Sequence, residues 1–156
     1  MLSGATGQFY GNHHTWQFLP DWKSHIDTAG SKQVGYLVKL LAGRRWWQLV
    51  PDQAHTLLTS GYGTFTSDGN VQSSDYATAA RTPDGRLAIA YLPTVRTVTI
   101  DTSELAANVV ARWYDPSAGT YTSAVPTAKN GSTSSFRPPD QNRGGDGDWV
   151  LVFSQT

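Results

Sequence analysis

The stretch from Asn108 to Tyr121, NVVARWYDPSAGTY, constrains the fold more than any other part of the chain. Its first half alternates with period two, as expected of a β-strand with two different faces, and one face carries Val109, Ala111 and Trp113. The segment 115–119, DPSAG, then favours a turn, because proline presets the backbone angle and glycine tolerates a positive φ. The pattern predicts a β-hairpin whose first strand directs a tryptophan into a sandwich core.

The C-terminal part of the chain shows the same extended character. From about residue 60 the sequence is rich in Thr, Ser, Gly and Val and has no helical periodicity. Short strands separated by turn residues are typical of an antiparallel β-sandwich, which is the fold class that we predict for residues 61–156. The expected strands are 76–81, 87–92, 96–101, 109–114, 120–124 and 148–154.

The N-terminal part, residues 1–60, has a different organisation. Residues 1–11 suggest a short strand that leads into a glycine-rich loop, and an amphipathic pattern then predicts a helix near 28–42. A strand–loop–helix unit cannot bury both of its faces. It must pack on the sandwich, pair with another copy or belong to a larger α/β domain. Because its strand and helix would otherwise expose apolar surface, we expect self-association as a homodimer.

Composition excludes several classes of function. The chain has 12 basic and 12 acidic residues, which argues against a nucleic-acid or anionic-membrane partner. It has no cysteine, so neither a disulfide framework nor a thiolate metal site is possible. We also expect no cofactor. No apolar run approaches the roughly 20 residues that span a bilayer, and the N-terminus lacks the layout of a signal peptide, so the compartment stays open.

Five stretches of the chain form a recognisable set: FYGNHHTW (9–16), WWQLVPD (46–52), AIAYLP (88–93), ARWYDPSAG (111–119), and FRPP (136–139) with DWVLV (148–152). In this order they resemble the C-terminal end of a bacterial glycoside-hydrolase-like family. In that family a (β/α)₈ barrel, related to the apiosidase and cellulase-like clan, precedes a small sandwich named for collagen binding. The resemblance implies that residues 1–60 are the last strand, loop and helix of a barrel, and that the parent protein is secreted or periplasmic.

The resemblance also indicates where a ligand would bind. The loop after the last strand faces the substrate in such barrels, and this implies sugar contacts from Tyr10, Asn12, His13, His14 and Trp16. Trp22 lies in similarly polar, irregular sequence and is the other aromatic side chain that we expect to be exposed.

Several other motifs have plain structural explanations. Adjacent histidines on an extended chain point to opposite faces, and no HxxxH motif accompanies them, so we predict no metal site. Asp146-x-Asp148 indicates a polar turn before the last strand, and Trp46-Trp47 a wedge between helix and sandwich. Trp113 and Trp149 follow strand patterns and are expected in the core.

The family's catalytic carboxylates belong to earlier barrel strands, so no catalytic residue can be assigned by resemblance. Asp21 and Asp27 are the acids near the aromatic loop, and neither lies in a recognisable motif. We therefore predict a carbohydrate-interacting accessory module of a glycoside hydrolase. The alternatives are a stand-alone glycoside hydrolase of plant polysaccharide, with a site around residues 10–27 that a second chain could complete, and a collagen-like protein-binding module.

Overall fold

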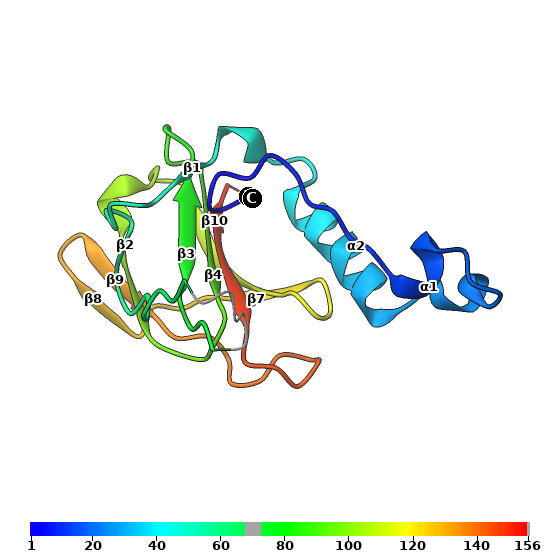
Figure 1. Ribbon diagram of the computed structural model, residues 1–156. Coiled ribbons are helices and arrows are strands. Elements are labelled where there is room, and N and C mark those ends of the chain that lie inside the picture. The colour runs from blue at the N-terminus through cyan, green and yellow to red at the C-terminus, as the bar shows by residue number, and fades with distance from the viewer. Residues whose placement is uncertain (68–72, 156) are drawn as a thin grey trace.

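Two antiparallel β-sheets pack face to face in the computed structural model, which describes residues 1–67 and 73–155 (Figure 1). Every pairing between neighbouring strands is antiparallel. The six-stranded sheet has the order β1 (Val50–Pro51), β3 (Thr78–Arg81), β4 (Leu87–Leu92), β10 (Trp149–Ser154), β6 (Val110–Asp115) and β7 (Thr120–Ser123). The four-stranded sheet has the order β2 (Leu58–Ser60), β5 (Val98–Asp101), β9 (Thr133–Phe136) and β8 (Ala128–Asn130).

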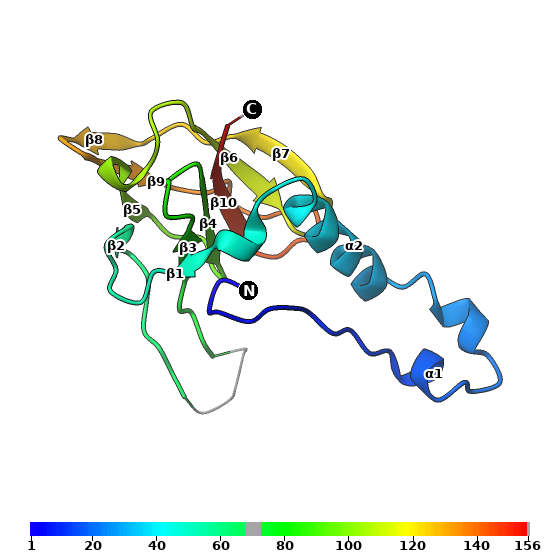
Figure 2. The same ribbon diagram turned by 90° about the horizontal axis from the view of Figure 1, so that it is seen from above.

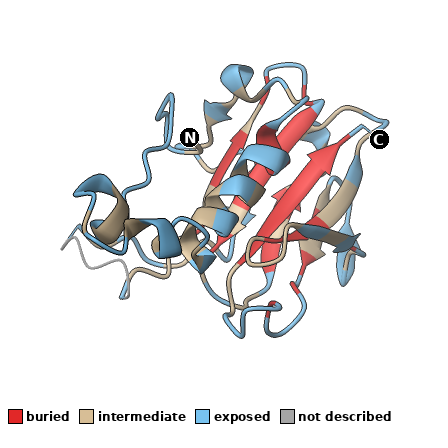
Figure 3. Ribbon diagram, turned by 90° about the vertical axis from the view of Figure 1, so that its right-hand side faces the viewer, coloured by how far each residue is buried: buried red, intermediate tan, exposed pale blue. Residues whose placement is uncertain are grey.

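The central strand β10 is buried along its whole length. Trp149, Leu151 and Phe153 belong to the core between the two sheets, whereas Val150 and Val152 belong to a second cluster on the outer face. This division follows from the alternation of side chains along a strand. Both faces are buried because the four-stranded sheet covers one and helix α2 (Ala29–Leu41) covers part of the other (Figure 3).

The predicted hairpin is confirmed. Strands β6 and β7 pair with Asp115 opposite Thr120, and the 115–119 turn joins them. Trp113 is 2% exposed in the core and makes a T-shaped contact with Trp149, at 6.5 Å between ring centroids. Both tryptophans are therefore core residues, as expected.

Helix α2 forms almost over the predicted range. Thr28 caps its start by accepting a 3.3 Å hydrogen bond from the N–H of Ser31. Leu40 and Leu41 are buried against the outer face of the six-stranded sheet. Val38 is 61% exposed, because the helix turns Leu37 and Leu40 toward the sheet.

All six expected strands form, with small shifts at their ends. Strands β1, β2, β8 and β9 were not predicted. The strand expected within residues 1–11 does not form, because no strand of the described chain lies beside it to supply hydrogen bonds. The two tryptophans expected as a wedge begin η2 (Trp46–Gln48), a 3₁₀ turn.

The remaining helices are short: α1 (His13–Trp16), η1 (Trp22–His25) and η3 (Thr102–Glu104). Within the described residues, no helix has the length and apolar character needed to cross a membrane.

Candidate functional site

An arm formed by residues 1–28 leaves the sandwich and extends away from it before the chain returns through α2 (Figures 1 and 2). Its outer end, which we call the lobe (residues 12–26), contains α1 and η1. Asn12 begins α1, since its side-chain oxygen accepts a 3.0 Å hydrogen bond from the N–H of His14. Neither short helix has a buried residue. The lobe is therefore an exposed structure without an apolar core.

The lobe presents aromatic side chains to solvent. Trp16 is 66% exposed and Phe18 is 71% exposed. The backbone of Phe18 has a φ of 52°, which turns the chain sharply after α1. Trp22 is half-buried and meets the Phe18 ring edge-to-face, at 5.5 Å between centroids. Trp16 therefore faces solvent as expected, and Trp22 is packed against a neighbour.

The expected sugar-contacting residues fall into separate places. Asn12 has a structural role as a helix cap, and His13 is exposed at the start of α1. Tyr10 lies nearer the sandwich, where its hydroxyl is 3.3 Å from the Thr28 hydroxyl and its side chain lines a cavity. The six predicted residues thus do not form one pocket.

Asp21 is the centre of a side-chain cluster in the lobe. Its two carboxylate oxygens contact His14 Nδ1 at 3.2 Å and His25 Nε2 at 3.0 Å. The two imidazole rings stack with their centroids 3.7 Å apart and an angle of 8° between their planes. The hydrogen bond to His14, followed by that to His25, lowers the pKa of the Asp21 carboxyl.

This cluster was not predicted from the sequence. We expected adjacent histidines on an extended chain, but His13 and His14 lie on a helical turn, and only His14 reaches Asp21. The sequence signal was the spacing of four between Asp21 and His25, which brings two side chains together on a helical turn.

The two carboxylates considered for catalysis differ in surroundings. The lowered pKa of Asp21 keeps it ionised, which does not suit a general acid. Asp27 is exposed and pairs with Lys32 at 3.4 Å. Neither residue lines the large cavity described next.

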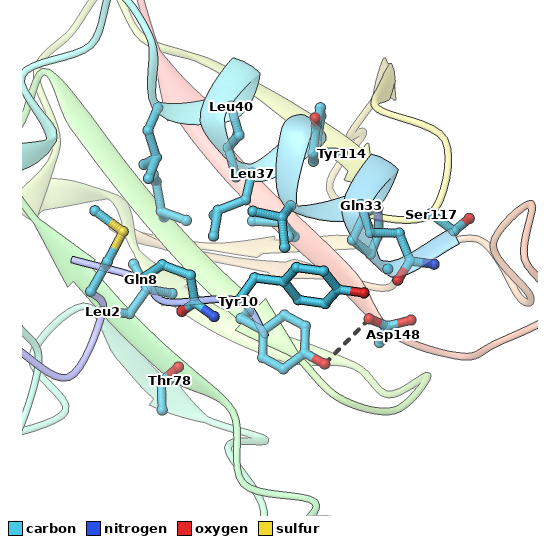
Figure 4. Close-up of a pocket in the computed structure, with 18 of the residues that line it drawn as sticks. Leu2, Gln8, Tyr10, Gln33, Leu37, Leu40, Thr78, Tyr114, Ser117 and Asp148 are labelled. Atoms are coloured by element: carbon cyan, nitrogen blue, oxygen red, sulfur yellow. Dashed lines mark hydrogen bonds between the residues drawn. The ribbon is translucent and has the colours of Figure 1, made fainter. Parts of the chain in front are cut away.

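A cavity of about 900 Å³ lies between the arm, α2 and the outer face of the six-stranded sheet (Figure 4). Leu37 and Leu40 of α2 and Ile89 and Val150 of the sheet give it an apolar wall. Its polar groups come from the arm, the helix and the sheet with its loops, and they include Gln8, Tyr10, Gln33, Tyr91, Asp146 and Asp148.

Asp148 is the polar centre of this cavity. The Tyr91 hydroxyl donates a 3.2 Å hydrogen bond to one carboxylate oxygen, and the Asn142 amide donates a 2.6 Å hydrogen bond to the other. Burial raises the pKa of the Asp148 carboxyl. Burial, together with the charge of Asp148, raises the pKa of the Tyr91 hydroxyl to about 12. The sequence indicated only a polar turn here, because the partner Tyr91 is distant along the chain.

The two tryptophans that follow α2 differ in their exposure to solvent. Trp46 packs against the outer-face cluster, as expected of a wedge, whereas Trp47 is 66% exposed. Trp47 is therefore an exposed aromatic residue outside the arm.

The chain is similar to glycoside hydrolases among solved structures. One, described as a glycoside hydrolase, matches with a TM-score of 0.62 and 22% identity over 86% of this chain and 27% of its own. Another, a glycoside hydrolase of family 5 from Bacteroides vulgatus ATCC 8482, matches with a TM-score of 0.63 and 23% identity over 86% of this chain and 26% of its own. This chain thus spans about a quarter of the length of these proteins.

No curated protein matches the chain. Residues 64–154, more than half of the chain, match a family described as "Putative collagen-binding domain of a collagenase". This match contains strands β3 to β10 of the β-sandwich, and β1 and β2 precede it. The chain belongs to that family of collagen-binding-like domains, in a fold that solved glycoside hydrolases share.

Proposed function

We propose that this chain is a carbohydrate-interacting accessory module of a glycoside hydrolase, and that the arm makes the contacts with sugar. The exposed aromatic surface of the lobe is the observation on which this proposal rests. Trp16 and Phe18 present most of their side chains to solvent on a segment that projects from the sandwich. Exposed aromatic rings of this kind mark binding surfaces, and a flat ring can stack on the apolar face of a sugar.

The extent of the structural similarity supports an origin in a larger protein. The family match begins at residue 64, and residues 64–156 make up less than the 86% of the chain that aligns with glycoside hydrolases. The alignment must therefore include part of the first 63 residues. We propose that residues 1–60 derive from the last strand, loop and helix of an apiosidase-like barrel. The strand position would be irregular here because its barrel neighbours are not in this chain.

Affinity electrophoresis in gels that contain plant polysaccharides tests the sugar contact. We expect retardation of the wild-type chain in at least one gel of the panel, and loss of that retardation in Trp16→Ala. Trp47→Ala is a matched control, since Trp47 is also 66% exposed but lies outside the arm. Unretarded migration in every gel, or equal loss in both variants, would contradict the proposal.

A catalytic role is tested separately by the release of reducing sugar. Glycoside hydrolysis requires two carboxyl groups on opposite sides of the bond, about 5–9.5 Å apart. Asp146 and Asp148 both line the cavity but come from the same loop before β10, and neither Asp21 nor Asp27 lines it. We expect no sugar release by the chain alone. Release that is lost in Asp21→Asn or Asp27→Asn would favour the stand-alone hydrolase instead.

Collagen binding is a second candidate, and the description of the matched family favours it. The matched residues contain strands β3 to β10 of the sandwich and none of the arm, so this activity would not need the arm. Retention on triple-helical collagen that Trp16→Ala leaves unchanged would support collagen binding through the sandwich, whereas absence of retention would exclude it.

We also propose that the chain self-associates. Val38 on the outer side of α2 is 61% exposed, and Phe9 on the arm is 95% exposed. Exposed apolar side chains of this kind favour a symmetric partner. Light scattering at micromolar concentration should give the mass of a dimer, and a monomer would contradict the proposal.

A further inference from the structure

Three side chains converge at the outer end of the arm, far from the core of the sandwich. His14 comes from α1, Asp21 directly precedes η1, and His25 ends η1. One ligand atom from each residue lies within 4.8 Å of the others. The contacts to the Asp21 oxygens measure 3.2 Å from His14 Nδ1 and 3.0 Å from His25 Nε2.

This set of atoms matches the donors that zinc prefers. Two imidazole nitrogens and a carboxylate, with a fourth position open to water, form a common three-ligand zinc site. Bonds of about 2.0–2.1 Å in a tetrahedral site place neighbouring ligand atoms about 3.3 Å apart. The observed separations of 3.0 and 3.2 Å are close to that value, and each nitrogen contacts a different oxygen of Asp21. An ion bound through one Asp21 oxygen would therefore require a rotation of the carboxylate and a reorientation of the two rings, without a change of the backbone segments that bring the three residues together.

The two imidazole rings are already held next to one carboxylate. His14 and His25 lie with centroids 3.7 Å apart, and each directs a nitrogen at Asp21. Because the lone pair of each nitrogen lies in the plane of its ring, the two rings would tilt out of their parallel stack to bind the same ion. One divalent ion would then join both rings to Asp21.

The lobe has no buried apolar residues in its helices that could stabilise it by packing. Its two helices have four residues each and contain no buried residue. Helices of this length are unstable in isolation, and their order usually comes from packing. A metal that joins His14 to His25 would order the ten residues between them, because binding free energy contributes to folding when the ligands are assembled.

We propose that His14, Asp21 and His25 bind one zinc ion and that this ion orders the lobe. The ion would fix the surface that carries Trp16. The site does not depend on the proposed sugar contact, since its ligands are separate from the exposed face of that tryptophan.

The chain provides matched controls for this site. His13 is adjacent to His14, and its ring contacts that of His14 at 5.5 Å, but it makes no contact with Asp21 among those described. His55 lies in the sandwich region, where its Nε2 is 2.9 Å from the Tyr76 hydroxyl. Because the chain has no cysteine, histidine and carboxylate groups are the strong zinc ligands available.

The direct test is a zinc titration of the tag-free, EDTA-treated chain in competition with a chromophoric chelator. We expect one equivalent of zinc to bind. His14→Ala and His25→Ala should each lose at least about 10-fold in affinity, as should Asp21→Asn, because each removes a ligand. His13→Ala should keep the wild-type affinity within about 2-fold, since it removes no ligand.

A second readout reports on order in the lobe. Lys23 lies within η1 and is exposed, so trypsin should cut there in the metal-free chain and more slowly when zinc is bound. This protection should be absent in His25→Ala, whose sandwich should unfold at the wild-type temperature. Failure of the wild-type chain to bind zinc saturably, or equal affinities in His13→Ala and His14→Ala, would overturn the proposal. Either result would leave a histidine–aspartate cluster held by hydrogen bonds alone.

Discussion

The hydroxyl of Tyr114 donates a 2.7 Å hydrogen bond to the main-chain carbonyl oxygen of Tyr36. Tyr114 lies on β6 and Tyr36 lies in α2, so this bond joins the helix to the outer face of the six-stranded sheet. Gly119 of the neighbouring turn lies against the Tyr36 ring. The hairpin of β6 and β7 thus supports the helix, and through it the position of the arm.

Removal of the Tyr114 hydroxyl should weaken this attachment. In Tyr114→Phe the ring still fills its place in the outer-face cluster, but the bond to Tyr36 is lost. We expect the free energy of unfolding to fall by about 1 kcal/mol in urea titrations. Tyr10→Phe is the control, because the Tyr10 hydroxyl is exposed and bonds only to Thr28 at 3.3 Å among the described contacts. Equal stability of Tyr114→Phe and wild type would show that the bond does not hold the helix.

Replacement of two glycines near this contact by alanine should change the stability of the fold in opposite directions. Gly119 has a φ of +68°, and an added Cβ would lie 2.6 Å from Tyr36 Cδ1, so Gly119→Ala should lose about 1–3 kcal/mol of stability. Gly35 lies within α2 and an added Cβ would meet no atom within 4 Å. Gly35→Ala should gain about 0.5–1 kcal/mol, because alanine favours a helix interior. Thermal unfolding of both variants checks the pair, and a change of the same sign in both would be inconsistent with the described packing.

Asp115 should make the fold sensitive to acid. Burial by itself raises the pKa of this carboxyl, but hydrogen bonds from Ser117, Ala118 and the N–H of Arg143 outweigh it, and the pKa lies below its ordinary value of 3.8. An acid with a lowered pKa stabilises the folded state above its unfolded-state pKa, and this contribution is lost as the pH falls through the folded-state pKa.

Asp115→Asn measures this contribution. The new amide would place a donor against the N–H of Arg143, which is 2.9 Å from a carboxylate oxygen, and should cost about 2 kcal/mol at pH 7. The difference from wild type should shrink as the pH falls below about 4. Asp140→Asn is the control, since its side chain is 92% exposed. A difference that stays constant from pH 7 to pH 2.5 would contradict this role.

The sandwich was largely predictable because its strands carry strong alternation and clear turns. LAIAYL at 87–92 was predicted with its observed ends, and the period-two pattern correctly placed Trp113 in the core. Strand β8 escaped prediction because Ala128–Asn130 is exposed throughout and has no apolar face. Strand β9 escaped because three of its four residues are Thr or Ser, so the alternation is hidden.

The arm was less predictable because its structure depends on contacts rather than on periodicity. The strand expected within residues 1–11 does not form, since no described strand lies beside it to supply hydrogen bonds. The cluster around Asp21 depends on two short helical turns that bring His14 and His25 together. The cavity at Asp148 joins residues from the arm, the helix and the sheet, which no local pattern brings together.

The most direct test of the sugar contact is intrinsic tryptophan fluorescence titrated with a panel of soluble glycans. Wild type, Trp16→Ala and Trp47→Ala should be compared, because the two tryptophans are equally exposed and only Trp16 lies on the arm. We predict a saturable shift with at least one glycan in wild type and Trp47→Ala, and no shift in Trp16→Ala. A shift that persists in Trp16→Ala, or no shift with any glycan, would contradict a carbohydrate-binding arm.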